Sequence, residues 1–285
     1  MIIKKTINSI QKLLEIEKVN LKKKVAFIPT MGALHDGHLS LIKSAKAKKQ
    51  FIIVSIYVNP SQFGPNEDFL KYPRSLKSDL KKLKNNNVDL VFTPNSKDLS
   101  RYKYKNYNFK TLGLERKLCG STRPYHFMGV AEIVLKFFTL LKPDVAYFGE
   151  KDYQQFIFIK KIVDQTNLKT KIMMGKTIRE KNGLALSSRN KYLKPEEVII
   201  AKNIFKILKE TRILIKKNKK QLSILKEQKR KLIACGFSNV EYFQILVDHL
   251  HDCVDYLPIL LHRVMHRDLN SCYHHLVDML YLKQL

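Results

Sequence analysis

The chain has 285 residues, 45% of them hydrophobic and 27% charged, which fits one large domain or two ordinary ones. This composition supports a buried core and excludes a chain that is disordered throughout or collagen-like. Basic residues outnumber acidic ones by 53 to 25, a net charge of +28. Such a charge attracts polyanions, but lysine is spread along the whole chain, which favours a compositional bias over a nucleic-acid-binding stripe.

No run of eighteen or more apolar residues is present, so we expect no membrane-spanning helix. The first eighteen residues, MIIKKTINSIQKLLEIEK, predict an amphipathic helix. They show no apolar stretch followed by a small-residue cleavage site, so no secretion signal is evident and a cytoplasmic location is expected. The four cysteines lack C-x-x-C spacing and are expected to be reduced, mostly buried thiols: Cys119, Cys235, Cys253 and Cys272.

Strand-like and helix-like segments alternate along the first two-thirds of the chain. Apolar runs predict strands at 24–29, 51–58, 88–92, 145–148 and 171–174. Helical spacing occurs between them at 39–49, 75–85, 130–141 and 153–164. This alternation predicts an α/β fold with a doubly wound parallel sheet, in which the loops after the strands lie along one edge.

The sequence changes in character after the last of these strands. Pro195, followed by two glutamates, begins a helix that is predicted to continue to about Lys217. A second basic helix is predicted at 222–234, and 241–247 is a candidate strand. We therefore expect a first domain at residues 1–177 and a smaller second domain at 178–285, linked by 179–189.

The tail from about residue 248 contains six of the nine histidines. One interpretation is a metal site made of His249, His251 and Cys253. The other is a tail of locally different composition without a site, and the absence of zinc-finger spacing favours it.

The segment PTMGALHDGH follows the first predicted strand and begins the first helix. Gly32 and Gly37 allow the backbone to approach a ligand closely, and His35 and His38 would share a face of a helical first turn. A helix N-terminus offers unpaired N–H groups to an anion. The segment therefore favours a nucleotide site over a plain strand-to-helix turn.

A second segment, FGEKDYQQ, follows the predicted strand at 145–148. Lys151 lies where this strand gives way to a helix, which is where a ligand at the edge of a parallel sheet is expected. Asp152 is alternatively a cap of that helix, and Gln155 lies about one turn further on.

Two loops carry candidate substrate ligands. The amides of Asn59 and Gln62, after the strand at 51–58, suit the hydroxyl and carboxylate groups of a small substrate, although a proline turn explains the same segment. Arg123 and His126 lie in a loop bounded by glycine and proline, which fits an anion clamp, a lid or an ordinary connection.

Two further segments are ambiguous on their own. Ser187, Ser188 and Arg189 can donate to a polyphosphate without being deprotonated, and an N-cap followed by a loop fits them equally well. The segment at 67–74 either binds a cation or orders the helix that follows it.

Six motifs, taken together and in order, resemble those of the pantothenate synthetase (pantoate–β-alanine ligase) family: PTMGALHDGH, VNPSQF, EDFLKYPR, STRPYHFMGV, FGEKDYQQ and GLALSSRNKYL. The likeness covers roughly residues 4–203 and then fades. Single motifs are shared with other H-x-G-H nucleotidyltransferases and with class I aminoacyl-tRNA synthetases. The resemblance implies ATP-dependent joining of (R)-pantoate to β-alanine through a pantoyl adenylate, with release of AMP and diphosphate. It also implies a Rossmann-like ATP domain, a C-terminal α+β lid domain, Mg²⁺ bound with ATP, and a homodimer.

The resemblance also implies roles for individual residues. Those that would bind ATP are Met31, Gly32, Ala33, Leu34, His35, Asp36, Gly37, His38, Gly149, Glu150, Lys151, Asp152, Ile178 (through its backbone), Leu186, Ser187, Ser188 and Arg189. His38 would be a proton donor, and the other candidate catalytic residues are His35, Lys151, Ser187, Ser188 and Arg189. Gln62 and Gln155 would hold pantoate, with Gln62 also near β-alanine, and the further candidates for substrate binding are Asn59, Arg123 and His126. No protein ligand is assigned to Mg²⁺, and neither Asp79 nor Asp152 is given that role.

The sequence departs from the family pattern at three places. The smallest change is Lys181-Asn182-Gly183 in place of the usual Ala-Asp-Gly type of turn. Glu132 stands where relatives usually carry a small residue, so it lies either near the substrate pocket or merely on a helix face. Residues 248–285 do not match the usual ending.

Two alternatives stay open at this point. One is another nucleotidyl-transferring enzyme with the H-x-G-H motif, and the other is a basic nucleic-acid-binding protein. No RNP-like motif or zinc finger favours the second.

Overall fold

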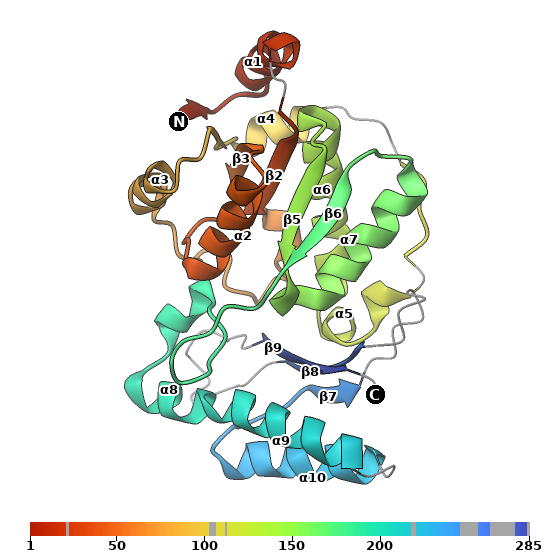
Figure 1. The fold of residues 1–285 in the computed structure, drawn as a ribbon. Coiled ribbons are helices and arrows are strands. Elements are labelled where there is room, and N and C mark those ends of the chain that lie inside the picture. The colour runs from red at the N-terminus through yellow and green to blue at the C-terminus, as the bar shows by residue number, and fades with distance from the viewer. Residues whose placement is uncertain are drawn as a thin grey trace. The chain divides into compact units, whose positions relative to one another are not determined.

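The computed structural model describes residues 1–20, 23–102, 107–111, 113–217, 221–245, 256–262 and 277–283. The chain forms two compact units, Met1–Lys176 and Thr177–Leu285. Figure 1 shows the order of the helices and strands along the chain.

A six-stranded sheet forms the centre of the first unit, and all of its described strand pairings are parallel. In order across the sheet the strands are β1 (Ile2–Lys4), β4 (Leu90–Phe92), β3 (Phe51–Ile56), β2 (Val25–Thr30), β5 (Val145–Gly149) and β6 (Lys171–Gly175). The expected α/β fold with a parallel, doubly wound sheet is therefore confirmed. The chain runs outward from β2 to β3 and β4 and then returns to the other side of β2 at β5, so the strand order reverses between β2 and β5. Ligands of such sheets bind beyond the carboxyl ends of the strands at this reversal.

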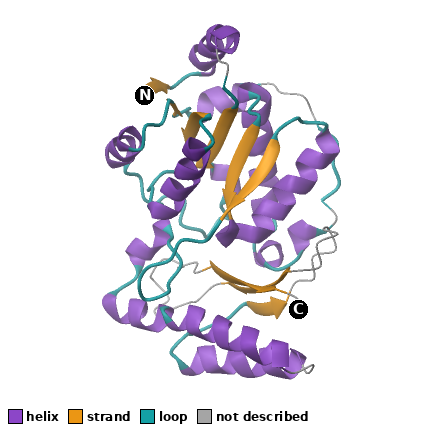
Figure 2. Cartoon of the chain, viewed as in Figure 1, coloured by secondary structure: helices purple, strands orange, loops and turns teal. Residues whose placement is uncertain are grey.

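Helices cover both faces of this sheet (Figure 2). The main ones are α2 (Asp36–Ala47), α3 (Leu76–Asn85), α6 (His126–Leu141) and α7 (Tyr153–Thr166). The shorter elements are α4 (Ser96–Arg101), α5 (Cys119–Thr122), and the 3₁₀ turns η1 (Pro60–Gln62), η2 (Leu114–Arg116) and η3 (Glu150–Asp152).

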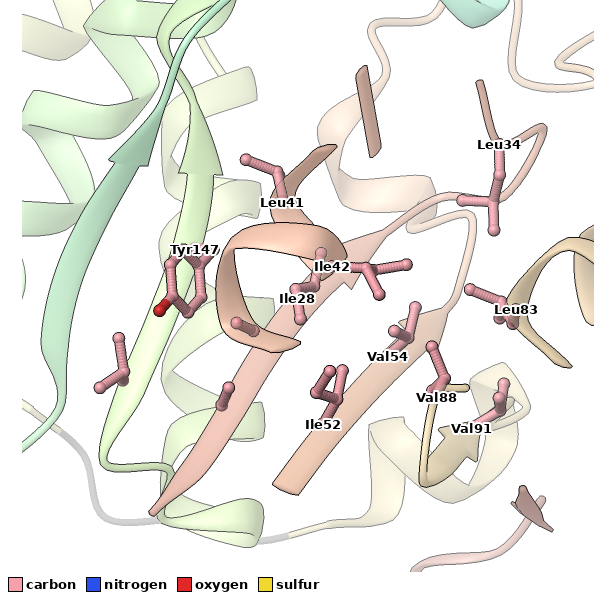
Figure 3. Close-up of a cluster of buried hydrophobic side chains, with 13 residues drawn as sticks. Ile28, Leu34, Leu41, Ile42, Ile52, Val54, Leu83, Val88, Val91 and Tyr147 are labelled. Atoms are coloured by element: carbon pink, nitrogen blue, oxygen red, sulfur yellow. The ribbon is translucent and has the colours of Figure 1, made fainter. Parts of the chain in front are cut away.

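Strand β2 illustrates how the two faces are filled. Successive side chains of a strand point to opposite faces, and Ile28 joins the buried cluster that contains Leu41 and Ile42 of α2 (Figure 3). The ring of Phe27 points to the other face and packs edge-on against Phe137 and Phe138 of α6, with centroids 5.5 and 6.2 Å apart. The core therefore fixes β2 from both sides, together with the loop that follows it.

The N-terminus differs from the expected single helix. Residues 2–4 form the edge strand β1, in which Ile2 pairs with Leu90 of β4, and only then does α1 (Ile7–Asn20) begin. The break has a local cause, because Thr6 and Ser9 exchange hydrogen bonds at the start of α1, with Ser9 N donating to Thr6 Oγ1 over 3.2 Å. The pairing with β4 joins segments nearly ninety residues apart and leaves no local signal in the sequence.

The second unit contains α8 (Pro195–Ala201), α9 (Asn203–Lys217), α10 (Gln221–Ala234) and an antiparallel sheet of β7 (Tyr242–Ile245), β8 (Tyr256–His262) and β9 (Val277–Lys283). The prediction of one continuous helix at 195–217 is wrong, because α8 ends at Ala201 and a second helix, α9, begins at Asn203. The side chain of Asn203 donates to the carbonyl of Ile200 over 3.1 Å and so competes with the backbone for a helix acceptor.

The tail forms two of these three strands, although its sequence departs from the family pattern. The proposed metal site at 249–253 lies outside the described residues. Cys119 and Cys235 are partly buried and form no disulfide bond within the described residues, and the other two cysteines lie outside the described residues. None of the described helices combines the length and apolar character needed to cross a membrane.

Candidate active site

The loop after β2 lies at the strand-order reversal and has an unusual backbone. Gly32 and Ala33 both adopt positive φ angles, 83° and 50°, and only glycine adopts such angles without a penalty. Thr30 supports the turn, since its Oγ1 accepts from Gly32 N at 3.2 Å and donates to Ser55 O at 2.7 Å. The carboxylate of Asp79 in α3 accepts from Ala33 N and Leu34 N, both at 2.9 Å.

The two histidines close the N-terminus of α2 in a reciprocal capping arrangement. His35 Nδ1 accepts from Gly37 N at 3.1 Å, and His38 Nδ1 accepts from His35 N at 3.3 Å. The two ring centroids lie 4.1 Å apart. Because each Nδ1 is an acceptor, the proton of each neutral ring lies on Nε2. Both imidazoles therefore offer an Nε2–H donor.

Burial, together with neighbouring positive charge, keeps these rings neutral. Burial, and then the neighbouring Lys151, lowers the pKa of His35 from 6.5 to about 4. Burial, and then His35 and Lys151, lowers the pKa of His38 from 6.5 to about 3. At pH 7 both histidines are hydrogen-bond donors without a formal charge.

Several main-chain N–H groups of this segment have partners inside the protein. The N–H groups of Gly32, Ala33 and Leu34 donate to oxygens of Thr30 and Asp79. The N–H of Gly37 donates to His35. With these amides committed inside the protein, the imidazole Nε2–H groups are donors that this loop can offer to a ligand.

Lys151 follows β5, on the other side of the strand-order reversal. Its ammonium pairs with Asp152 Oδ1 at 2.9 Å, and both side chains act electrostatically on the two histidines. Asp152 stands at the N-cap position of α7, but its side chain makes no capping hydrogen bond. The structure thus brings the predicted residues of the first and second segments into one cluster, with the imidazoles beside an ammonium group.

The turn η1, which carries Gln62, is held from the N-terminal end of α6. Arg123 donates to Gln62 O at 3.0 Å and forms an ion pair with Glu67 in which both side chains are nearly buried. His126 Nδ1 lies 2.8 Å from the same carbonyl oxygen. The amide nitrogen of the buried Asn59 donates to Gly129 O at 3.0 Å. Three predicted substrate ligands therefore make intrachain contacts that support this turn.

Gln62 and Gln155 behave differently. Within the described part of the chain, neither side-chain amide has a hydrogen-bond partner, and both are partly exposed. They are therefore available to hold a ligand. Glu132 forms an ion pair with Lys136 one turn along α6, at 2.7 Å, and it also lines a cavity together with Ser61 and Gly129.

The segment LSSRN belongs to the second unit and follows a short hairpin. Leu186 N donates to Ile178 O at 2.9 Å, and Arg179 pairs with Ala185. Ser187 Oγ accepts from Arg189 N at 3.3 Å and caps the 3₁₀ turn η4 (Ser188–Tyr192). Ser187 therefore acts as an N-cap, as one of the two interpretations of this segment expected. Ser188 is buried.

Sequence reasoning missed two residues that shape the first unit's site, Asp79 and Lys82. It singled out the segment at 67–74 but not the ion pair that Glu67 forms with Arg123. A signal existed for Asp79, because it lies four residues before Leu83 and shares its buried helix face, and a carboxylate on an apolar face needs hydrogen-bond partners. Its partners lie some 45 residues away in sequence, and no local pattern identifies them.

The described residues contain no cluster of three histidine, cysteine or carboxylate side chains suited to a metal ion.

Comparison with known proteins agrees with this geometry. The family model described as pantoate-beta-alanine ligase matches residues 2–260. The chain belongs to the pantoate–β-alanine ligase family. The pantothenate synthetase of Thermosipho africanus is 41% identical over 242 residues, which span 83% of this chain and 87% of the relative. That of Thermodesulfovibrio yellowstonii is 48% identical over 202 residues, 71% of this chain and 72% of the relative.

Solved structures of the family resemble the whole chain. The pantothenate synthetase of Thermus thermophilus superposes with a TM-score of 0.86 at 32% identity, covering 98% of this chain and 99% of the other. The pantoate-beta-alanine ligase of Francisella tularensis, complexed with beta-gamma ATP and beta-alanine, gives 0.80 at 35% identity, covering 98% and 97%.

Proposed function

We propose that this protein is an ATP-dependent ligase that joins (R)-pantoate to β-alanine to form pantothenate, with release of AMP and diphosphate. Family membership supports the reaction, and the ATP and β-alanine in the Francisella tularensis structure support two of the substrates. The observation that carries the proposal is the pair of neutral Nε2–H imidazoles beside Lys151 at the strand-order reversal.

The first step needs charge stabilisation more than proton transfer. The pantoate carboxylate is already ionised at pH 7, and one of its oxygens forms a bond to the α-phosphorus of ATP while the bond to diphosphate breaks. Negative charge then grows on the phosphoryl oxygens. Preorganised donors at those oxygens lower the barrier, and removing one such donor typically costs about 10²–10³ in kcat.

The lowered pKa of His38 bears on the role that the resemblance implies for it. Burial, which lowers that pKa to about 3, leaves the ring neutral at pH 7, so the proton that His38 offers is that of Nε2–H. We assign His35 and His38 as neutral hydrogen-bond donors to the phosphates through Nε2–H, with Lys151 as the neighbouring positive charge.

In the second step the amine of β-alanine attacks the acyl carbon of pantoyl adenylate. The new carbon–nitrogen bond replaces the bond to the AMP oxygen, and AMP leaves. We assign the uncommitted amides of Gln62 and Gln155 to pantoate, and Gln62 also to β-alanine. Arg123, His126 and Asn59 act on the substrate through Gln62, because their polar groups already bind the turn that carries it.

Magnesium enters as part of the substrate, as the complex of Mg²⁺ with ATP. This ion keeps several waters and needs few protein ligands. Ser187, Ser188 and Arg189 stay proposed phosphate-binding residues on the basis of their motif. A cytoplasmic location and a homodimer are likewise proposals that follow from the family.

Exchange of labelled diphosphate into ATP tests the function directly. Pantoate should stimulate exchange by the full-length protein, other hydroxy acids should not, and adding β-alanine should yield pantothenate and AMP. Exchange with a different acid would favour another nucleotidyl-transferring enzyme. Tight binding of RNA that weakens steeply with salt, without exchange, would favour the nucleic-acid alternative.

A further inference from the structure

Helix α3 directs two charged side chains onto the loop that precedes the histidines. Asp79 is 1% exposed, and its two carboxylate oxygens accept from Ala33 N and Leu34 N at 2.9 Å. Lys82, one turn further along, donates from Nζ to Leu34 O at 2.5 Å. The N–H and the C=O of Leu34 are thus both held by the same helix.

The backbone of this loop explains why such a clamp is needed. Successive residues with unusual φ angles turn their N–H groups into a concavity that attracts anions, and here the carboxylate of Asp79 fills it. Ala33 has a side chain and still adopts a φ of 50°. Such a strained conformation persists only where surrounding contacts hold the backbone in place. Here the hydrogen bonds from Asp79 and Lys82 of α3 hold it.

The clamp extends to the imidazoles through one peptide bond. The carbonyl of Leu34 and the N–H of His35 belong to the same planar unit. Lys82 donates to the oxygen of this peptide, Leu34 O. The N–H of the same peptide, His35 N–H, donates to His38 Nδ1 at 3.3 Å. A rotation of this peptide would remove the donor that keeps the proton of His38 on Nε2.

We propose that Asp79 and Lys82 are positioning residues for adenylate formation, which hold the peptide between Leu34 and His35 so that His38 presents Nε2–H to the phosphates. Neither residue needs to touch ATP. The catalytic part of this inference depends on the proposed function, whereas the effect on the imidazole proton does not.

The test uses the full-length chain with three substitutions at Lys82 and its neighbour. Lys82→Met removes the donor, Lys82→Arg keeps a charged donor, and Lys81→Met removes an exposed charge on the same helix. Two quantities are measured for each variant: kcat and KM for pantoate in diphosphate exchange, and the imidazole ¹⁵N shifts of His38 without ligand.

We expect Lys82→Met to lower kcat about tenfold, because small misplacements of catalytic groups are costly, with KM for pantoate within about twofold of the wild-type value. The two nitrogen shifts of His38 should move toward each other as the ring loses its single tautomer. Lys82→Arg should restore much of kcat and of the shift difference, and Lys81→Met should match the wild type in both.

Asp79→Asn removes the charge that fills the concavity and should lower kcat by more, on the order of 10²-fold. If that variant does not fold, Lys82→Met decides the question. The inference is overturned if Lys82→Met retains wild-type kcat and a single Nε2–H tautomer. If the wild-type protein shows no pantoate-dependent exchange, the proposed function fails, and the ¹⁵N shifts still test the positioning of His38.

Discussion

Gly129 permits the close contact between α6 and the turn that carries Gln62. A Cβ atom built on Gly129 would lie 2.1 Å from Ser61 O, 2.5 Å from Ser61 C and 3.0 Å from Gln62 N. Ordinary van der Waals contact begins near 3.4 Å, so Gly129→Ala must displace the turn by about 1.3 Å. The obstructing atoms are backbone atoms, which have no rotamer to which they can move.

A displacement of about 1 Å in a binding group is enough to cost about 10²-fold in rate, or about 2.7 kcal/mol of transition-state stabilisation. We expect Gly129→Ala to lower kcat/KM for pantoate by that factor. The KM for ATP should change little, because the turn is not among the assigned ATP ligands. Diphosphate exchange at varied pantoate and ATP concentrations measures both quantities.

Gly64→Ala is the matched control, because Gly64 lies just after the same turn in the chain. Its added Cβ would meet nothing closer than Glu67 Oε1 at 3.5 Å, so its kinetics should equal those of the wild type. Circular dichroism of both variants would report any loss of fold. A correctly folded Gly129→Ala protein with wild-type kcat/KM for pantoate would refute the role of the turn, and with it the assignment of Gln62.

Three further predictions follow from the site. His38→Ala should lower kcat of diphosphate exchange by about 10²–10³, the cost of one preorganised donor, and near-wild-type turnover would contradict the role. Arg123→Met should raise KM for pantoate by loosening the carbonyl of Gln62, whereas Arg116→Met, which removes a side chain that is 85% exposed, should not. The free energy of unfolding should fall as pH drops from 6.5 toward 4, because the unfolded chain binds protons at His35 and His38 that the native state excludes. Each histidine contributes a slope of up to about 1.4 kcal/mol per pH unit. His38→Gln should flatten the curve in urea titrations between these pH values, and an unchanged slope would contradict the lowered pKa of His38.

Much of this protein follows from the order of residues along the chain. Apolar runs and helical spacing place β3 and α7 closely, because a strand buried on both faces reads as a continuous apolar segment. The two histidines at the start of a helix after the first strand point to an anion site, because helix N-termini leave donors unpaired.

Only the tertiary structure decided how those donors are used. The N–H groups of Ala33 and Leu34 would be free for a phosphate if the loop stood alone, but Asp79, some 45 residues away, accepts both. In the same way Arg123 lies 61 residues from the carbonyl it binds. Local sequence determines which groups are available. Long-range packing determines their partners, because hydrogen bonds between distant segments form only once the sheet has brought those segments together.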